Sequence, residues 1–213
     1  MIGFAIISGV EAGAASHTQE YANRLIRLQM PRWKRWLGFH RLHAWNLRRL
    51  DPGLTLDVGC GIGRNLIHVR GVGVDVNEHC VRAARERGLD AFTPTEFKAS
   101  EHDRSGRFDS LLVAHVVEHM TEDQAVALVR EYEPLVRPGG QLLLMAPQEA
   151  GFKSDSTHVQ FMDFARLSRI AALAGFAPAR TLSFPLPRLA GRWFKYNEFV
   201  LVSRKPPSDR PRR

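Results

Sequence analysis

Short apolar runs alternate with amphipathic segments along this chain from residue 54 onward. Runs such as LTLDV, from Leu54 to Val58, are too short for helices and are bounded by glycine or polar residues, which is typical of buried strands. Between these runs, apolar residues spaced by three and four positions predict helices. The predicted strands lie at 54–58, 71–76, 89–92, 108–116, 141–147, 179–185 and 197–205, and the predicted helices at 63–69, 78–88, 121–136 and 161–176.

The order of these elements predicts the fold class. Strands that alternate with helices form a parallel α/β sheet with helices on both faces. Because no helix separates the last two strands, we expect one antiparallel strand near the C-terminus. The pattern therefore predicts a Rossmann-like, doubly wound, mostly parallel sheet of seven strands. We divide the chain into a flexible N-terminus at 1–17, a basic helical cap at 18–50, the α/β domain at 51–204 and a basic tail at 205–213.

The composition fits one globular domain. The chain has 213 residues, of which 44% are hydrophobic and 24% charged. No apolar run approaches the roughly 20 residues of a membrane-spanning helix. The first 17 residues have the apolar stretch of a secretory signal, but they lack a positive start and Glu11 interrupts them, so we interpret them as a loose terminus. Cys60 and Cys80 have no CxxC spacing, and we expect reduced thiols and a cytoplasmic protein.

Positive charge is concentrated near the N-terminus. The net charge is +8, and residues 21–50 contain many Arg and Lys, three tryptophans and no acidic residue. Such a segment binds nucleic acid in some proteins and is the solvated face of amphipathic helices in others. We expect the cap at 18–50 to cover a bound ligand as a lid that excludes water.

Three glycines, Gly59, Gly61 and Gly63, follow the first predicted strand. In an open α/β sheet, ligands bind at the carboxyl ends of the strands, and glycines let the backbone turn sharply and approach a ligand closely. Asp75 ends the next strand, where a carboxylate can accept hydrogen bonds from two ribose hydroxyls. The glycine spacing departs from the nicotinamide fingerprint G-x-G-x-x-G.

The stretch LDVGCGIGRNL, with Asp57 two residues before the first glycine, resembles motif I of the class I S-adenosylmethionine-dependent methyltransferases. Three later stretches, FDSLLVAHVVEHM, LVRPGGQLLLMAP and HVQFMDFARLSRIAALAGF, resemble that family's fourth strand, fifth strand and following helix. The resemblance implies that 51–204 is a methyltransferase domain that binds S-adenosylmethionine. It implies cofactor contacts by Asp57, Gly59, Cys60, Gly61, Gly63, Asp75, Val76, Ala114 and His115.

One part of the resemblance is less regular. After the third strand the family usually has an acidic residue, often Asp, that reads the adenine amino group. Here Glu96, with Phe97 beside it, takes that place, and a solvated surface carboxylate is the alternative interpretation of Glu96.

The residues from His115 to His119 also match H-x-x-E-H, a zinc-protease pattern. That pattern needs both histidines on one face of a helix and a third ligand. Here it falls at the end of a predicted strand. We therefore interpret the Ala114–His115 backbone as part of the site for the methionine end of the cofactor, and Glu118 and His119 as structural.

Two histidines are placed to remove a proton from a methyl acceptor. His115 ends the fourth strand, and His158 lies in the loop after the fifth strand, which faces the acceptor in this family. An ordinary histidine pKa of about 6.5 suits a general base, although a structural role for His158 stays open. Asp155 offers a ligand for a divalent ion such as Mg²⁺, but the sequence gives too few ligands to define a metal site.

The loop from Gln148 to His158 is rich in hydrogen-bonding side chains, which favours a hydroxyl-rich acceptor. The stretch resembles bacterial sugar methyltransferases, including those that act on methylated mannose polysaccharides. We expect O-methylation of a sugar or another polar small molecule, such as a methylated mannoside or polysaccharide precursor. A tRNA or rRNA methyltransferase is the first alternative, and a non-catalytic cofactor-binding protein is the second. The oligomeric state stays open.

Overall fold

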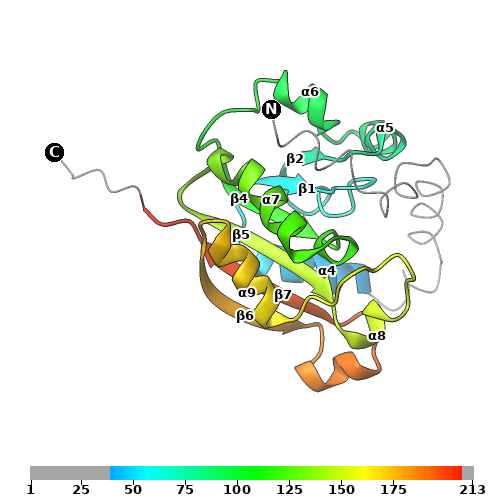
Figure 1. The fold of residues 1–213 in the computed structure, drawn as a ribbon. Coiled ribbons are helices and arrows are strands. Elements are labelled where there is room, and N and C mark those ends of the chain that lie inside the picture. Colours follow the sequence, from blue (N-terminus) through cyan, green and yellow to red (C-terminus); the bar gives the residue numbers. More distant parts are fainter. Residues whose placement is uncertain (1–38, 208–213) are drawn as a thin grey trace.

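The computed structural model describes residues 39–207, which form an α/β domain around one sheet (Figure 1). The strand order is β3-β2-β1-β4-β5-β7-β6. The strands are β1 (Leu54–Val58), β2 (Arg70–Val74), β3 (Ala91–Phe92), β4 (Phe108–Ala114), β5 (Val136–Pro147), β6 (Ala177–Phe184) and β7 (Glu198–Arg204). Strand β7 is antiparallel to β5 and β6, and β1 to β5 pair in parallel. The predicted fold class is thereby confirmed.

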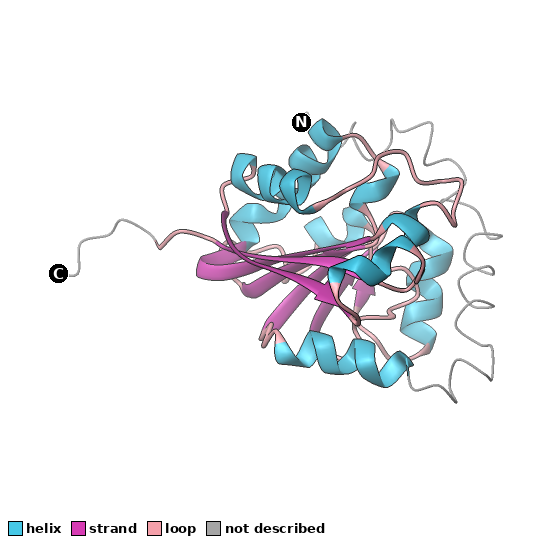
Figure 2. Ribbon diagram, turned by 90° about the horizontal axis from the view of Figure 1, so that it is seen from below, coloured by secondary structure: helices cyan, strands magenta, loops and turns pink. Residues whose placement is uncertain are grey.

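Helices cover both faces of the sheet (Figure 2). They are α4 (Phe39–Arg49), α5 (Glu78–Glu86), α6 (Pro94–Lys98), α7 (Glu122–Tyr132), α8 (Glu149–Phe152) and α9 (Phe164–Leu173), with short 3-10 turns at Val117–His119, Glu133–Leu135 and Arg188–Arg192. Apolar residues of α7 and α9 pack on one face, and Leu47 of α4 and the following Leu50 pack on the other with Leu112 and Leu143. The sheet is thus buried between two helical layers, as its apolar strands require.

The structure differs from the predicted organisation at residues 63–69. The helix predicted at 63–69 is wrong, because this segment forms a series of turns with hydrogen bonds such as His68 N–H to Asn65 O. The predicted segment at 1–17, the first part of the cap at 18–50 and most of the tail at 205–213 lie outside the described residues. Within 39–207, no helix has the length and apolar character needed to cross a bilayer. Both cysteines are free and buried.

The strand order reverses between β1 and β4, so the carboxyl ends of these neighbours define the ligand-binding edge of the sheet. Gly59 follows β1 with a φ of 77°, a left-handed conformation that favours glycine. A Cβ atom at Gly59 would overlap the side chain of Val116, which follows β4. The fold therefore brings the glycine loop and the segment after β4 into direct contact.

Candidate active site

The glycine loop and Asp75 lie together, as the sequence predicts. The backbone N–H of Gly61 donates to Asp75 Oδ2 over 2.7 Å, and the N–H of Asn77 donates to Asp75 Oδ1 over 2.9 Å. The Gly59 N–H reaches back to the Val74 carbonyl of β2 over 2.8 Å. The half-buried carboxylate is thereby fixed at the carboxyl end of β2, at the edge where an α/β sheet binds its ligand.

Asp57 and Cys60 lie beneath this loop rather than on its surface. Asp57 is completely buried at the end of β1, and its Oδ1 accepts from Asn65 Nδ2 over 3.4 Å. Burial, with the nearby Asp75 carboxylate, raises the pKa of Asp57 to about 7. Cys60 fills the space that a side chain at Gly73 would occupy, and burial raises its thiol pKa well above the ordinary value. Cys60 is therefore a packing residue with little thiolate character.

The residues predicted near the adenine take different positions. Val76 is half-buried in the bend between β2 and α5. Glu96 is exposed, receives two hydrogen bonds from Arg85 at 2.8 and 3.2 Å, and caps α6 through Thr93. These donors, Arg85 first, lower the pKa of Glu96 to about 2. Phe97 is 1% exposed and belongs to the apolar core. Adenine contacts by Glu96 and Phe97 stay predictions.

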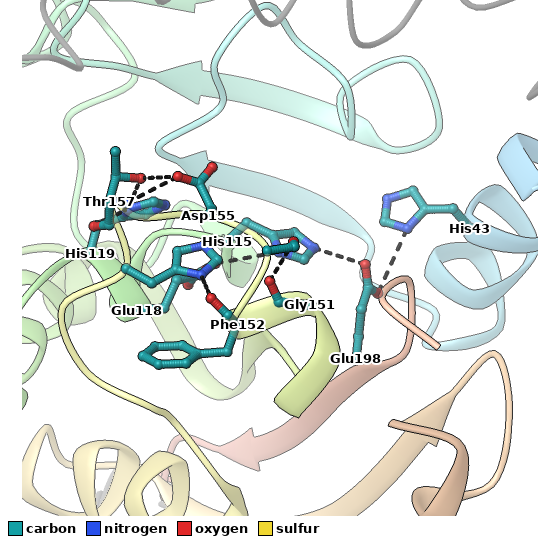
Figure 3. Close-up of polar contacts among 11 residues, drawn as sticks. His43, His115, Glu118, His119, Gly151, Phe152, Asp155, Thr157 and Glu198 are labelled. Atoms are coloured by element: carbon teal, nitrogen blue, oxygen red, sulfur yellow. Dashed lines mark hydrogen bonds and ion pairs between the residues drawn. The ribbon is translucent and has the colours of Figure 1, made fainter. Parts of the chain in front are cut away.

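His115 sits at the carboxyl end of β4 between two carboxylates (Figure 3). Its Nε2 lies 2.8 Å from Glu198 Oε1, and its Nδ1 lies 3.4 Å from Glu118 Oε1. Its φ of 59° is unusual for a residue other than glycine and turns the chain sharply away from the buried Ala114. Burial opposes a charge on the ring, but Glu198 and Glu118 outweigh it and raise the pKa of His115 to about 10.

Glu198 and His43 are the residues that the sequence interpretation missed. Glu198 opens β7, and its Oε2 lies 4.0 Å from His43 Nδ1 on α4. Burial would raise the pKa of Glu198, but the positive charge of His115 holds it down at about 2. Burial lowers the pKa of His43 to about 4, so this ring is neutral near pH 7. An acid that opens an otherwise apolar strand, in NEFVLVS, is the signal that points to Glu198.

His158 lies beside His119 and Glu118 rather than beside His115. The rings of His119 and His158 have centroids 4.9 Å apart, and His158 stacks on Phe152 at 5.2 Å. The H-x-x-E-H pattern does not lie on one helix, since His115 directly follows β4 and His119 ends a 3-10 turn. His115 instead pairs with Glu198, so the two histidines of that pattern face different partners.

Much of the polar loop after β5 is used internally. Gln148 is completely buried and donates to Ser183 Oγ and the Glu198 carbonyl. Glu149 pairs with Arg188. Asp155 Oδ1 accepts from both the N–H and the hydroxyl of Thr157, at 3.0 and 2.8 Å. These bonds order the loop that carries His158 and leave fewer of its side chains for an acceptor than the sequence suggests.

The family comparison agrees with this geometry. Residues 56–142 match the family model described as "Methyltransferase domain", and they include the glycine loop, Asp75 and β4. Within these residues the chain matches a class I S-adenosylmethionine-dependent methyltransferase domain. The match supports methyl transfer from S-adenosylmethionine as the chemistry of this segment.

Curated relatives match only part of the chain. The chain is 34% identical over 95 residues to tRNA (carboxymethyluridine(34)-5-O)-methyltransferase of Xenopus tropicalis. This alignment covers 43% of this chain and 15% of that protein. The protein of the same name from Macaca fascicularis is 33% identical over 103 residues, covering 46% of this chain and 15% of its own length. The chain thus spans about 15% of the length of these relatives.

Solved structures share the fold at low identity. An S-adenosylmethionine-dependent methyltransferase from Archaeoglobus fulgidus aligns with a TM-score of 0.61 and 17% identity, over 82% of this chain and 100% of that one. Magnesium protoporphyrin IX methyltransferase from Synechocystis, with bound S-adenosylhomocysteine, aligns with a TM-score of 0.57 and 20% identity, over 79% and 84% of the two chains. At these identities the likeness establishes the fold.

Proposed function

We propose that this enzyme transfers the methyl group of S-adenosylmethionine to an oxygen atom of a polar acceptor. The main observation in support is the cluster of Glu118, His119 and His158. It lies beyond the carboxyl ends of β4 and β5, on the same edge of the sheet as the glycine loop. A hydroxyl acceptor must lose its proton as the methyl group arrives, and polar groups of this kind assist that loss. The names of both curated relatives also specify transfer to oxygen.

The cofactor lies, in this proposal, along the carboxyl ends of β1, β2 and β4. Gly59, Gly61 and Gly63 face its adenosine, and the Asp75 carboxylate accepts from the ribose hydroxyls. The Ala114–His115 backbone faces its methionine end. Since the sulfonium is already activated, the enzyme acts mainly by holding the acceptor in line with the methyl group, which can lower the barrier by roughly 7–11 kcal/mol.

His115 has a positioning role in this proposal. Its ring is held by Glu198 and Glu118, and its pKa of about 10 keeps it protonated near pH 7. A protonated imidazole cannot accept the acceptor's proton, so this proposal does not use His115 as the base. Glu118, His119 and His158 are then the groups that assist deprotonation.

The acceptor we favour is a hydroxyl-rich small molecule, as in a sugar. The side chains of Lys153 and Ser156 are exposed on the loop that carries His158, so a polar acceptor would find hydrogen-bonding partners there. A tRNA is the second candidate, because both curated relatives are named for a tRNA acceptor and the net charge of +8 favours an anionic partner.

A methyl-transfer assay separates these candidates. The full chain is incubated with methyl-labelled S-adenosylmethionine and either oligosaccharides or bulk tRNA. Base-stable label on a sugar supports an ether product, whereas label on tRNA with strongly salt-dependent binding supports the second candidate. Label that resides on nitrogen or carbon overturns transfer to oxygen.

A further inference from the structure

Glu118, His119 and His158 come from two separate loops and meet at one point. One ligand atom from each side chain lies within 4.8 Å of those of the other two. The backbone fastens the loops together, because the N–H groups of Val159 and Gln160 both donate to the Glu118 carbonyl, at 2.7 and 3.1 Å. The convergence of the three side chains is therefore built into the main chain.

The hydrogen bonds of the two rings select one nitrogen for ligation. His119 Nδ1 lies 3.1 Å from the Thr157 carbonyl oxygen, and His158 Nδ1 lies 2.7 Å from the Phe152 carbonyl oxygen. A carbonyl oxygen only accepts, so each Nδ1 carries a hydrogen and each neutral ring keeps its lone pair on Nε2. Metal-binding histidines are oriented in this way, with the second nitrogen donating to a carbonyl or carboxylate.

Glu118 supplies an independent observation that a ligand belongs here. Its side chain is 1% exposed. Oε1 lies 3.4 Å from His115 Nδ1, and Oε2 has no hydrogen-bond partner among the described residues. A buried carboxylate oxygen without a partner is costly, and a cation between Glu118 and the two histidines would remove that cost.

We propose that Glu118, His119 Nε2 and His158 Nε2 bind one divalent first-row transition ion, such as Zn²⁺ or Mn²⁺. Two imidazole nitrogens with one carboxylate suit such ions, whereas Mg²⁺ prefers oxygen ligands throughout. Three protein ligands leave coordination positions open to an oxygen of the substrate. The site thus differs from the Mg²⁺ and Asp155 arrangement that the sequence suggests.

The role of this ion rests on the proposed function. Bound to the ion, an acceptor hydroxyl loses its proton more easily. In the transfer step the O–H bond breaks and its proton passes to water, the O–CH₃ bond forms, and the S–CH₃ bond breaks to leave S-adenosylhomocysteine. The ion therefore takes the place of a histidine base in assisting deprotonation.

Cobalt binding tests the site without any acceptor. The full, untagged chain is freed of metal with a chelator and titrated with Co²⁺, and visible absorption and calorimetry are recorded. We expect one Co²⁺ per chain, with affinity at least about tenfold weaker in His119→Ala, His158→Ala and Glu118→Gln. The control is His79→Ala, because His79 lies partly buried on α5, contacts Arg82 and is not one of the proposed ligands. His158→Gln replaces His158→Ala if the latter fails to fold by circular dichroism.

Three outcomes overturn the proposal. The proposed site is wrong if both histidine variants bind Co²⁺ with the wild-type affinity. It is also wrong if the wild-type chain shows no saturable Co²⁺ binding. Mg²⁺ that competes as well as Zn²⁺ removes the assigned class of ion. The failure of the proposed function looks different, because the ion still binds while no oxygen acceptor is methylated. If the metal-free enzyme methylates an oxygen at the full rate, transfer to oxygen is supported and the proposed role of the ion in deprotonation is wrong.

Discussion

Nε2 of His115 lies 2.8 Å from Oε1 of Glu198, and this contact joins the end of β4 to the start of β7. The two strands are not neighbours, since β5 lies between them in the sheet. The antiparallel direction of β7 brings Glu198 opposite Pro147, at the same edge where β4 ends. Strand β7, the last strand in the chain order, therefore supplies the negative charge of Glu198 that holds His115 in the candidate active site.

Replacing this counter-charge should destabilise the fold. Glu198→Gln leaves a protonated His115 with Glu118 as its remaining carboxylate neighbour, and loss of one partner of this partly buried pair costs about 1–3 kcal/mol. Urea denaturation near pH 7 measures the change. The double variant Glu198→Gln/His115→Gln should lose less unfolding free energy than the two single variants together, because each single variant already removes the same contact. Additive losses would show that the two side chains stabilise the protein independently.

Asp75→Asn should weaken cofactor binding by about 10–100-fold, because it removes a charged acceptor whose hydrogen bonds are each worth about 1.5–3 kcal/mol. It also weakens the anchor of the Gly61 N–H, which donates to this carboxylate over 2.7 Å. Calorimetry with S-adenosylhomocysteine measures the affinity. Asp90→Asn, at an exposed position directly before β3, is the matched control and should bind normally. Equal affinity in the two variants would contradict the ribose assignment of Asp75.

The sheet and the glycine loop could be predicted because their signals are local. Apolar runs such as 54–58 define strands, and the spacing from Gly59 to Asp75 depends only on one strand–loop–strand unit. The contact of His115 with Glu198 could not be predicted, since it depends on how β7 pairs with β5. The turns at 63–69 were also missed, because apolar spacing alone does not distinguish a helix from successive turns.

Asp57 should make the stability of the free protein decline as the pH rises. Its pKa is about 7 in the fold and about 3.9 in an unfolded chain, so the folded state holds the proton more tightly. The free energy of unfolding therefore falls between about pH 4 and pH 7 and then levels off. Asp57→Asn removes this contribution and should be about 2–4 kcal/mol more stable than the wild type at pH 8, with little difference at pH 4. Urea denaturation at both pH values checks it, and an unchanged difference between them would rule out a buried, proton-retaining Asp57.

Leu47 should contribute to the core of the domain rather than to a detachable cap. Its side chain is completely buried with Leu112 and Leu143. Leu47→Ala should cost about 2–5 kcal/mol of unfolding free energy, as large-to-small substitutions in a core do. Leu42→Ala, on the same helix but 42% exposed, is the control and should cost much less. Similar small losses in both variants would mean that α4 adds little to the fold, as the cap interpretation implies.

His158→Ala should lower turnover by about 10²–10⁴-fold, the range expected when assistance to a proton transfer is lost. The affinity for S-adenosylmethionine should stay nearly intact, because His158 is held by the Phe152 carbonyl on the loop after β5 and belongs to the proposed acceptor side of the site. Single-turnover rates with saturating acceptor, together with calorimetry on the cofactor, separate the two effects. His102→Ala, between α6 and β4, is the control and should turn over normally. If His158→Ala retained the wild-type rate, neither direct proton transfer nor metal ligation by His158 would explain how the acceptor oxygen loses its proton. In-line positioning alone would then have to account for the reaction.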